Sequence, residues 1–468
     1  MPGVSMRPGQ YTRALPLRMM KRYKIPLLLI CLHIPLGLLL YSSGALALLH
    51  PLIVLAVGLL WAGRKNVPFE KVTYATAYLV GVEVLWRMAR SPVFWEFGKY
   101  GAAAIMIVAL VRRGHLKIPP LPLIYLGLLI PSCFLTFINN DFETARMMIS
   151  SNMSGPIALF ISCWYFSAIK MNWLQIRKTL IFISIPLISV AVATLFFTVT
   201  IENLTFGSES NTLTSGGFGP NQVSAMLGLG VFVCLTCLLL FNNDLKTMLY
   251  LGLGAVFFAA QSVMTFSRGG IYNAVGAALV VIVLQMRDLN KNIKKFLPLF
   301  AIGLLFLVIV FPYLDGFTGG KLQQRFRETS TTNRTEIVES DLELFLRNPF
   351  LGVGVGEAKS AREEFYGRQS SSHTEFTRLI SEHGILGVFS LIALAFGTFY
   401  NFRRQRSGMG KALVAGTVVW GCLFMLNAGM RLAAPSFMWG MSFLTILPLA
   451  AARIRRPLRF PNRNLVKR

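Results

Sequence analysis

The chain has 468 residues, of which 54% are hydrophobic and 14% are charged, and its formal net charge is +26. Soluble domains usually carry about 25% charged residues, and the apolar residues here come in blocks of roughly 17 to 22, the length that crosses a bilayer as a helix. These features exclude a soluble globular protein. In a membrane protein the excess of Lys and Arg is explained by their role in fixing the orientation of the helices, so we expect no nucleic-acid partner.

The chain begins with a basic segment, residues 1–24, which contains six Lys and Arg residues. An apolar run starts at Ile25 and continues into the next block without a small-residue cleavage site. We therefore expect a first membrane helix here and not a cleaved signal peptide.

The apolar blocks predict an all-α polytopic bundle with up to fourteen transmembrane helices. The predicted spans are 25–41, 44–61, 72–88, 92–111, 119–137, 153–169, 179–198, 220–241, 247–265, 269–286, 296–313, 384–402, 412–429 and 433–452. The third and fourth contain several charged residues, so twelve spans with a re-entrant or interfacial pair would fit nearly as well.

The distribution of basic residues predicts the orientation. The two termini and the segments 62–71, 112–118, 170–178, 242–246, 287–295 and 403–411 hold 31 of the 46 Lys and Arg residues. Because basic residues in short loops stay inside, we expect a cytoplasmic N-terminus (1–24) and tail (453–468), with membrane regions at 25–313 and 384–452. Residues 314–383 then form one long helical outer loop.

The six cysteines all lie in apolar segments, and Cys234 and Cys237 form a CxxC pair without a nearby histidine or second pair. We interpret them as small hydrophobic residues and expect no metal site.

Two predicted helix starts lie on the outer side. Gly219-Pro220-Asn221 begins one span, with proline at the first helical position, where it is tolerated. Ser267, a good N-cap, precedes Arg268 at the positive end of the next helix. A bound anion would explain this arginine, but so would a side chain that extends toward lipid headgroups, and both interpretations stay open.

The long loop contains a predicted amphipathic helix from Asn333-Arg334 to Asn348-Pro349, with Val338, Leu342 and Phe345 at helical spacing. A glycine-rich run follows, from Pro349 to Gly356. It lacks the strand–turn–helix context of a dinucleotide fingerprint, so its glycines indicate a sharp fold or a close approach to a ligand.

The end of the loop contains His373. Ser372 and Glu375 have the spacing of a capping box, which predicts a structural role for Glu375 and places His373 in the first helical turn. His383 is about 280° around that helix, so the two histidines do not share a face.

The order of these motifs resembles the bacterial O-antigen ligase and O-antigen polymerase family. The motifs are Gly219-Pro220-Asn221, Ser267-Arg268-Gly269-Gly270, Arg334, Pro349 to Gly356, and His373-Thr374, separated by nine residues from Gly384-Ile385-Leu386-Gly387. Family ligases usually have Asn, Ser or Gln after the histidine, where this chain has Thr374.

The resemblance implies a GT-C-like, metal-independent glycosyltransferase of the bacterial inner membrane, without a cofactor. It implies an undecaprenyl-diphosphate-linked glycan as donor and a lipid A-core sugar or carrier-linked glycan as acceptor, at the periplasmic face. Its implied catalytic residues are His373 and Arg268, and the implied substrate-binding residues are Arg334, Asn221, Gly352, Gly354 and Arg378.

Two other classes stay open. A polysaccharide flippase would also be polytopic, but transporters commonly show internal repeats and charges at mid-membrane. Here we find no clear repeat, and only Glu83 lies deep in a span. A scaffold protein would use the long loop as a binding domain and would leave Arg268 and His373 without a purpose.

Overall fold

The computed structural model describes residues 27–200, 206–207, 209–286, 289–328, 334–363, 367, 369 and 372–448. The basic segments 1–24 and 453–468, expected in the cytoplasm, lie outside these residues.

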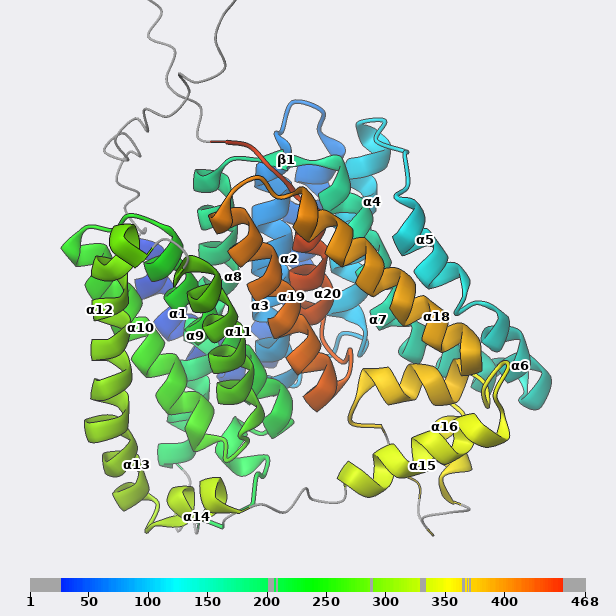
Figure 1. Cartoon of the computed structure of the whole chain (residues 1–468). Coiled ribbons are helices and arrows are strands. Elements are labelled where there is room, and N and C mark those ends of the chain that lie inside the picture. The colour runs from blue at the N-terminus through cyan, green and yellow to red at the C-terminus, as the bar shows by residue number, and fades with distance from the viewer. Residues whose placement is uncertain are drawn as a thin grey trace, which may run out of the picture.

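The described chain is almost entirely helical (Figure 1). Its first half forms α1 (Leu27–Ser42), α2 (Gly44–Gly63), α3 (Phe69–Met88), α4 (Phe97–Arg112), α5 (Pro120–Gly127), α6 (Pro131–Asn139), α7 (Phe142–Ala168), β1 (Lys170–Met171) and α8 (Trp173–Thr200). Its second half forms η2 (Leu213–Ser215), α9 (Pro220–Leu240), α10 (Leu245–Met264), α11 (Gly269–Met286), α12 (Leu289–Leu305), the π turn η3 (Phe306–Val310), α13 (Phe311–Phe317), α14 (Lys321–Arg327), α15 (Arg334–Arg347), α16 (Ala358–Ala361), α18 (Glu375–Arg404), α19 (Gly408–Ala428), α20 (Ala434–Gly440), η4 (Met441–Phe443) and β2 (Thr445–Ile446).

Among the described residues, nine helical segments are long and apolar enough to cross a bilayer. Each predicted span up to 412–429 overlaps a helix. The predicted span 119–137 is split into α5 and α6 just before Pro131, because proline has no main-chain N–H to donate to the preceding turn. The fold is therefore an all-α polytopic membrane protein, as the composition predicted.

The last predicted span, 433–452, is wrong as a continuous helix. After the seven-residue α20, the chain passes through η4 into β2, which pairs in parallel with β1. Leu447 N–H also donates to Met171 O at 2.9 Å, so the extended segment finds its main-chain partners in β1 and not within a helix. This pairing places 445–446 beside 170–171, at what we call the strand end of the bundle.

Figure 1 shows that the start of α12 and the turn between α18 and α19 also lie at the strand end, while α14, α15 and α16 lie at the opposite, loop end. Three segments that the basic residues assigned to one side of the membrane therefore share one end of the bundle, namely 170–178, 403–411 and the described part of 287–295.

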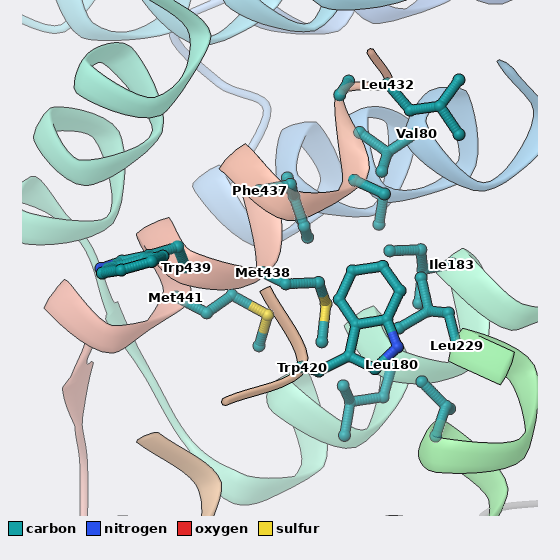
Figure 2. Close-up of a cluster of buried hydrophobic side chains, with 14 of the residues drawn as sticks. Val80, Leu180, Ile183, Leu229, Trp420, Leu432, Phe437, Met438, Trp439 and Met441 are labelled. Atoms are coloured by element: carbon teal, nitrogen blue, oxygen red, sulfur yellow. The ribbon is translucent and has the colours of Figure 1, made fainter. Parts of the chain in front are cut away.

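The centre of the bundle is an apolar cluster around Trp420 of α19, which is fully buried. Figure 2 shows the indole ring close to side chains of α8, α9 and α20. The labelled neighbours include Leu180, Ile183, Leu229 and Met438. A helix that is apolar on all sides is typical of a bundle core, and α9 is such a helix, whereas the apolar segment of α12, η3 and α13 buries none of its residues.

A polar chain joins α1, α2 and α3, and its partners fix the histidine tautomers. His33 Nδ1 donates to Leu29 O at 2.7 Å, so its Nε2 accepts from the Tyr78 hydroxyl at 3.1 Å. Trp86 Nε1 donates to His50 Nδ1 at 2.9 Å, so His50 Nε2 donates to the Tyr78 oxygen at 3.2 Å. Every member is satisfied with both rings neutral, and α3 is thereby fixed beside the charged residues described next.

Candidate active site

The charges that weakened the third and fourth predicted spans converge on the turn between α19 and α20. Glu83 and Arg87 of α3 form a buried ion pair at 2.9 Å, and Lys99 of α4 is buried as well. All three bond to the main chain of residues 429–433, which we call the 429–433 turn. The contacts are Arg87 to Arg431 O (2.9 Å), Lys99 to Met430 O (3.3 Å) and Ala433 N–H to Glu83 Oε2 (2.7 Å).

The helix α18 is kinked at Gly384, whose φ of 60° and ψ of −141° are not helical. A kink frees main-chain groups that need other partners, and the glycine-rich run supplies them. Val353 N–H and Gly354 N–H donate to Ser381 O and Glu382 O at 3.0 and 3.2 Å, and Ile385 N–H donates to Pro349 O at 2.7 Å. The two sequence motifs are therefore one structural unit.

Glycine is required at this junction. Gly352 has a φ of +68°, and a Cβ there would overlap the main chain of Glu382; a Cβ at Gly384 would overlap the main chain of Pro349 and Phe350. Gly352 and Gly354, predicted to bind substrate, thus lie against the α18 kink. Gly356 lines the adjacent pocket.

The face of α15 differs from the prediction. The buried residues are Ile337, Ser340, Asp341 and Leu344, not the predicted row of Val338, Leu342 and Phe345. Asp341 is fully buried. Its carboxylate forms an ion pair with Arg362 and accepts hydrogen bonds from the hydroxyls of Thr377 (2.7 Å) and Ser381 (3.2 Å). This network binds the long loop to the first half of α18, because a buried carboxylate requires such partners.

The predicted capping box before α18 is wrong. Thr374 is the N-cap, and its hydroxyl accepts from Phe376 N–H at 3.2 Å. Ser372 instead contacts Arg362, and Glu375 is buried in a salt bridge with Arg378. The helix begins at Glu375, so His373 lies just before the helix and not in its first turn.

His373 is half-buried, and its Nδ1 atom has no hydrogen-bond partner among the described residues. Burial and the positive charges of Arg334, Arg431 and Arg362 lower the pKa of His373 from 6.5 to about 4. The imidazole is therefore neutral at physiological pH, with a ring nitrogen ready to accept a proton.

Arg334 lies near His373 and also near Arg268. Arg334 donates to Asn427 Oδ1 at 3.1 Å, and Asn427 lies against Gly269. Burial and the charges of Arg325 and Arg268 lower the pKa of Arg334. Arg268 donates to Glu328 O, at the end of α14. Such close cations favour binding of an anion between them.

Asn221 joins α9 to the turn before α11. Pro220 is the first residue of α9, as predicted, and Asn221 Oδ1 accepts from the Ser267 hydroxyl at 2.8 Å. Ser224 donates to Ser267 O at 2.7 Å, and a Cβ at Gly270 would overlap Ser224 O. The Ser-Arg-Gly-Gly motif is therefore partly a close-packing device, which fixes the main chain of Arg268.

Arg378 occupies the wall of a pocket of ≈ 410 Å³. It forms ion pairs with Glu375 and Glu382, one turn before and one turn after it on α18. Both oxygens of Glu375 accept from Arg378, and one also accepts from Met430 N–H at 3.3 Å. This triad holds α18 against the 429–433 turn.

The structure places Arg334 near both His373 and Arg268. Four residues of the adjoining pocket and of the network that supports α18 were not predicted from the sequence: Asp341, Arg362, Gln222 and Arg431. Asp341 and Arg362 look like ordinary loop charges in the sequence. Arg431 carried a usable signal, because it is the one basic residue between the predicted spans 412–429 and 433–452.

Comparison with known proteins supports the family suggested by the motifs. No curated protein matches the chain significantly. A family model described as O-antigen ligase matches residues 253–392, a segment that runs from α10 through the long loop into α18 and contains Arg268, Arg334 and His373. Residues 253–392 are therefore similar to the O-antigen ligase family, in agreement with the resemblance that the motifs indicate.

Proposed function

We propose that the protein transfers a glycan from an undecaprenyl-diphosphate carrier to an acceptor hydroxyl at the outer face of the bacterial cytoplasmic membrane. The observation that carries this proposal is neutral His373, whose Nδ1 has no hydrogen-bond partner among the described residues and which lies among Arg334, Arg362 and Arg431, with Arg268 near Arg334. The family match favours a transferase over the transporter and scaffold alternatives.

The reaction needs three things that these residues offer. Arg268 and Arg334 hold the diphosphate, the leaving group, and stabilise the charge that develops on it as its bond to the anomeric carbon breaks. His373 takes the proton from the acceptor hydroxyl as the acceptor oxygen bonds to that carbon. Because arginine and histidine supply both charge stabilisation and proton transfer, we propose a metal-independent reaction without a cofactor.

The remaining predicted site residues take positioning roles in this proposal. Asn221 fixes the main chain beside Arg268 through Ser267. Gly352 and Gly354 support the kink of α18, and Arg378 holds α18 against the 429–433 turn through Glu375. A catalytic histidine just before α18 depends on all of these supports.

Two acceptors fit the same chemistry, namely a sugar hydroxyl of lipid A-core and the glycan on a second carrier. We propose that the loop end faces the periplasm, with both termini in the cytoplasm. The basic segments at the strand end support this orientation through the positive-inside rule.

Deleting the gene in its host, and complementing it with wild type or His373→Ala, tests the proposal and separates the acceptors. Surface polysaccharide is read on a gel. Loss of polymer from its lipid acceptor, with long chains accumulating on the carrier, indicates a ligase, whereas single repeat units in place of long chains indicate a polymerase. An unchanged ladder in the deletion strain would contradict the proposed function.

A further inference from the structure

The pocket that Arg378 borders is built by segments far apart in the sequence. It lies where Trp95 and the start of α4, the middle of α7, the start of α9, the first half of α18 and the 429–433 turn meet. Arg268, Arg334 and His373 are not among its lining residues, but Ser372, the neighbour of His373, is. The pocket therefore adjoins the candidate catalytic residues without being the space between the two arginines.

Arg431 presents a cation to this pocket. Its guanidinium makes one hydrogen bond to the described residues, from Nη2 to Ser372 O at 3.4 Å. The nearby carboxylates of Glu375 and Glu382 are engaged by Arg378. Burial lowers the pKa of Arg431, and the negative charge of Glu375 does not fully offset this effect. Such a half-buried arginine has several donors available for an anionic ligand.

The main chain of Arg431 is held unusually firmly for a turn. Its carbonyl and the main-chain groups beside it bond to four charged side chains, namely Glu83, Arg87, Lys99 and Glu375. Three of the four, all but Arg87, are no more than 3% exposed. The main chain that carries the Arg431 side chain is thereby held rigid, which reduces the entropy lost when a ligand binds.

Gln222 provides a second and independent observation. Its side chain is only 6% exposed, it lines the same pocket, and its Oε1 atom is buried without a hydrogen-bond partner among the described residues. A buried amide oxygen without a donor is costly, and it calls for a ligand that carries one.

A pocket with an unpaired acceptor and an undercompensated cation matches a hydroxylated ligand that also carries a negative charge. We propose that this pocket binds the acceptor sugar through Gln222, which accepts from a hydroxyl, and Arg431, which binds an anionic group on or next to that sugar. The assignment to the acceptor rests on the proposed function. Arg431 lies outside the segment that the family model matches, 253–392.

Binding to soluble probes tests the pocket without requiring transfer. The full chain in lipid nanodiscs is titrated with glucose 1-phosphate, which combines a sugar and an anion, with glucose, and with farnesyl diphosphate as a probe of the carrier. We expect wild type to prefer glucose 1-phosphate over glucose. Arg431→Gln should lose this preference, with about tenfold or greater weakening, the usual effect of losing a charged hydrogen bond.

Two matched variants complete the design. Gln222→Leu should weaken the binding of glucose 1-phosphate and of glucose. It should leave the thermal stability of the protein equal or higher, because it removes an unsatisfied buried acceptor. If Gln222 had only a structural role, the variant would instead be less stable. Arg146→Gln, in an exposed ion pair on α7, should change the binding of none of the three probes. Farnesyl diphosphate binding should respond to Arg334→Gln and not to Arg431→Gln.

The outcomes separate the two proposals. Absence of glucose 1-phosphate binding by wild type, or unchanged binding in Arg431→Gln, would overturn the pocket assignment. Loss of farnesyl diphosphate binding in Arg431→Gln would also overturn it, because Arg431 would then belong to the donor site. If the sugar-phosphate pattern holds while purified protein transfers no glycan, the proposed function fails and the pocket assignment stands.

Discussion

At the scale of single residues, the environment of His373 explains how a histidine can serve as a base among arginines. Burial and three guanidinium charges lower its pKa and keep the imidazole unprotonated. The same arrangement leaves positive potential at the place where an anionic leaving group would lie. When a diphosphate compensates these charges, the pKa of His373 should rise toward its ordinary value, which makes the ring a stronger base only when the donor is bound.

This coupling predicts a specific pH dependence. The acidic limb of kcat/KM reports the free enzyme, so its midpoint should lie near the lowered pKa of His373, about 4, and not near 6.5. Activity is then retained above that midpoint and lost as the pH falls through it. The acidic limb of the kcat profile reports the enzyme with substrate bound, so its midpoint should lie at a higher pH than that of kcat/KM. A kcat/KM midpoint near 6.5, or a kcat limb at lower pH than the kcat/KM limb, would contradict this account.

The corrected role of Glu375 changes the expectation for its substitution. A capping residue would tolerate Glu375→Gln, but the structure places this carboxylate in a buried pair with Arg378 and on Met430 N–H. Breaking a buried ion pair from one side typically costs about 3–5 kcal/mol. We expect a large drop in the melting temperature together with loss of activity.

The matched control is Glu343→Gln, because Glu343 pairs with Arg347 on the exposed surface of α15. Exposed pairs contribute about 0–1 kcal/mol, so this variant should melt close to wild type. Equal melting temperatures for the two variants, measured in the same detergent, would show that Glu375 has no structural role.

At the scale of elements, the main-chain hydrogen bonds between the glycine-rich run and the α18 kink hold the helix that follows His373 in place. Gly352→Ala should destabilise the protein for two reasons, since it forces a left-handed conformation, which costs about 1–2 kcal/mol, and overlaps the main chain of Glu382. Gly319 isolates the first reason, because it has a similar φ of +62° and a Cβ added there would meet no atom within 4 Å.

Thermal unfolding of the two alanine variants measures the difference. Gly319→Ala should lose only the conformational contribution, and Gly352→Ala should lose clearly more and also lower transfer activity. If both variants lose the same stability, the contact between the run and the kink is not what holds α18 in place.

The sequence predicted helices well where hydrophobic periodicity agrees with proline positions at the helix ends. It predicted them poorly where distant partners determine which residues are buried. Pro220 marked the start of α9, and Asn348-Pro349 marked the end of α15. The buried face of α15 was missed because the charge of Asp341 is compensated by Arg362, which lies 21 residues away in the sequence. The capping box failed because Glu375 has a stronger partner in Arg378 than the helix terminus could offer.

At the scale of the whole molecule, composition was sufficient to predict the all-α membrane fold, and motif order predicted the O-antigen ligase similarity that the family model finds in residues 253–392. The last predicted span failed because hydropathy does not distinguish a helix from an extended segment that pairs with a distant strand, here β2 on β1. The role of Arg431 could not be predicted from the sequence for a related reason. Its significance depends on the charges of α3 and α4 that bind its turn, and only the fold brings these together.

The proposed orientation is testable on single cysteine variants in spheroplasts. Arg347→Cys, on the exposed surface of α15, should react with a membrane-impermeant maleimide added outside. Lys170→Cys, an exposed position in β1 at the strand end, should react only after the membrane is permeabilised. Labelling of Lys170→Cys from outside would reverse the orientation and remove the periplasmic site.

Single-turnover glycan transfer by the purified protein shows whether His373 acts as the base of the reaction. A lipid-linked oligosaccharide donor and its acceptor are mixed with wild type, His373→Ala or His115→Ala, an exposed histidine near the strand end. General base catalysis is typically worth about 10²–10⁴-fold, so His373→Ala should be slower by that factor, with unchanged donor binding and melting temperature, and His115→Ala should match wild type. A folded His373→Ala protein that transfers glycan at the wild-type rate would contradict the account.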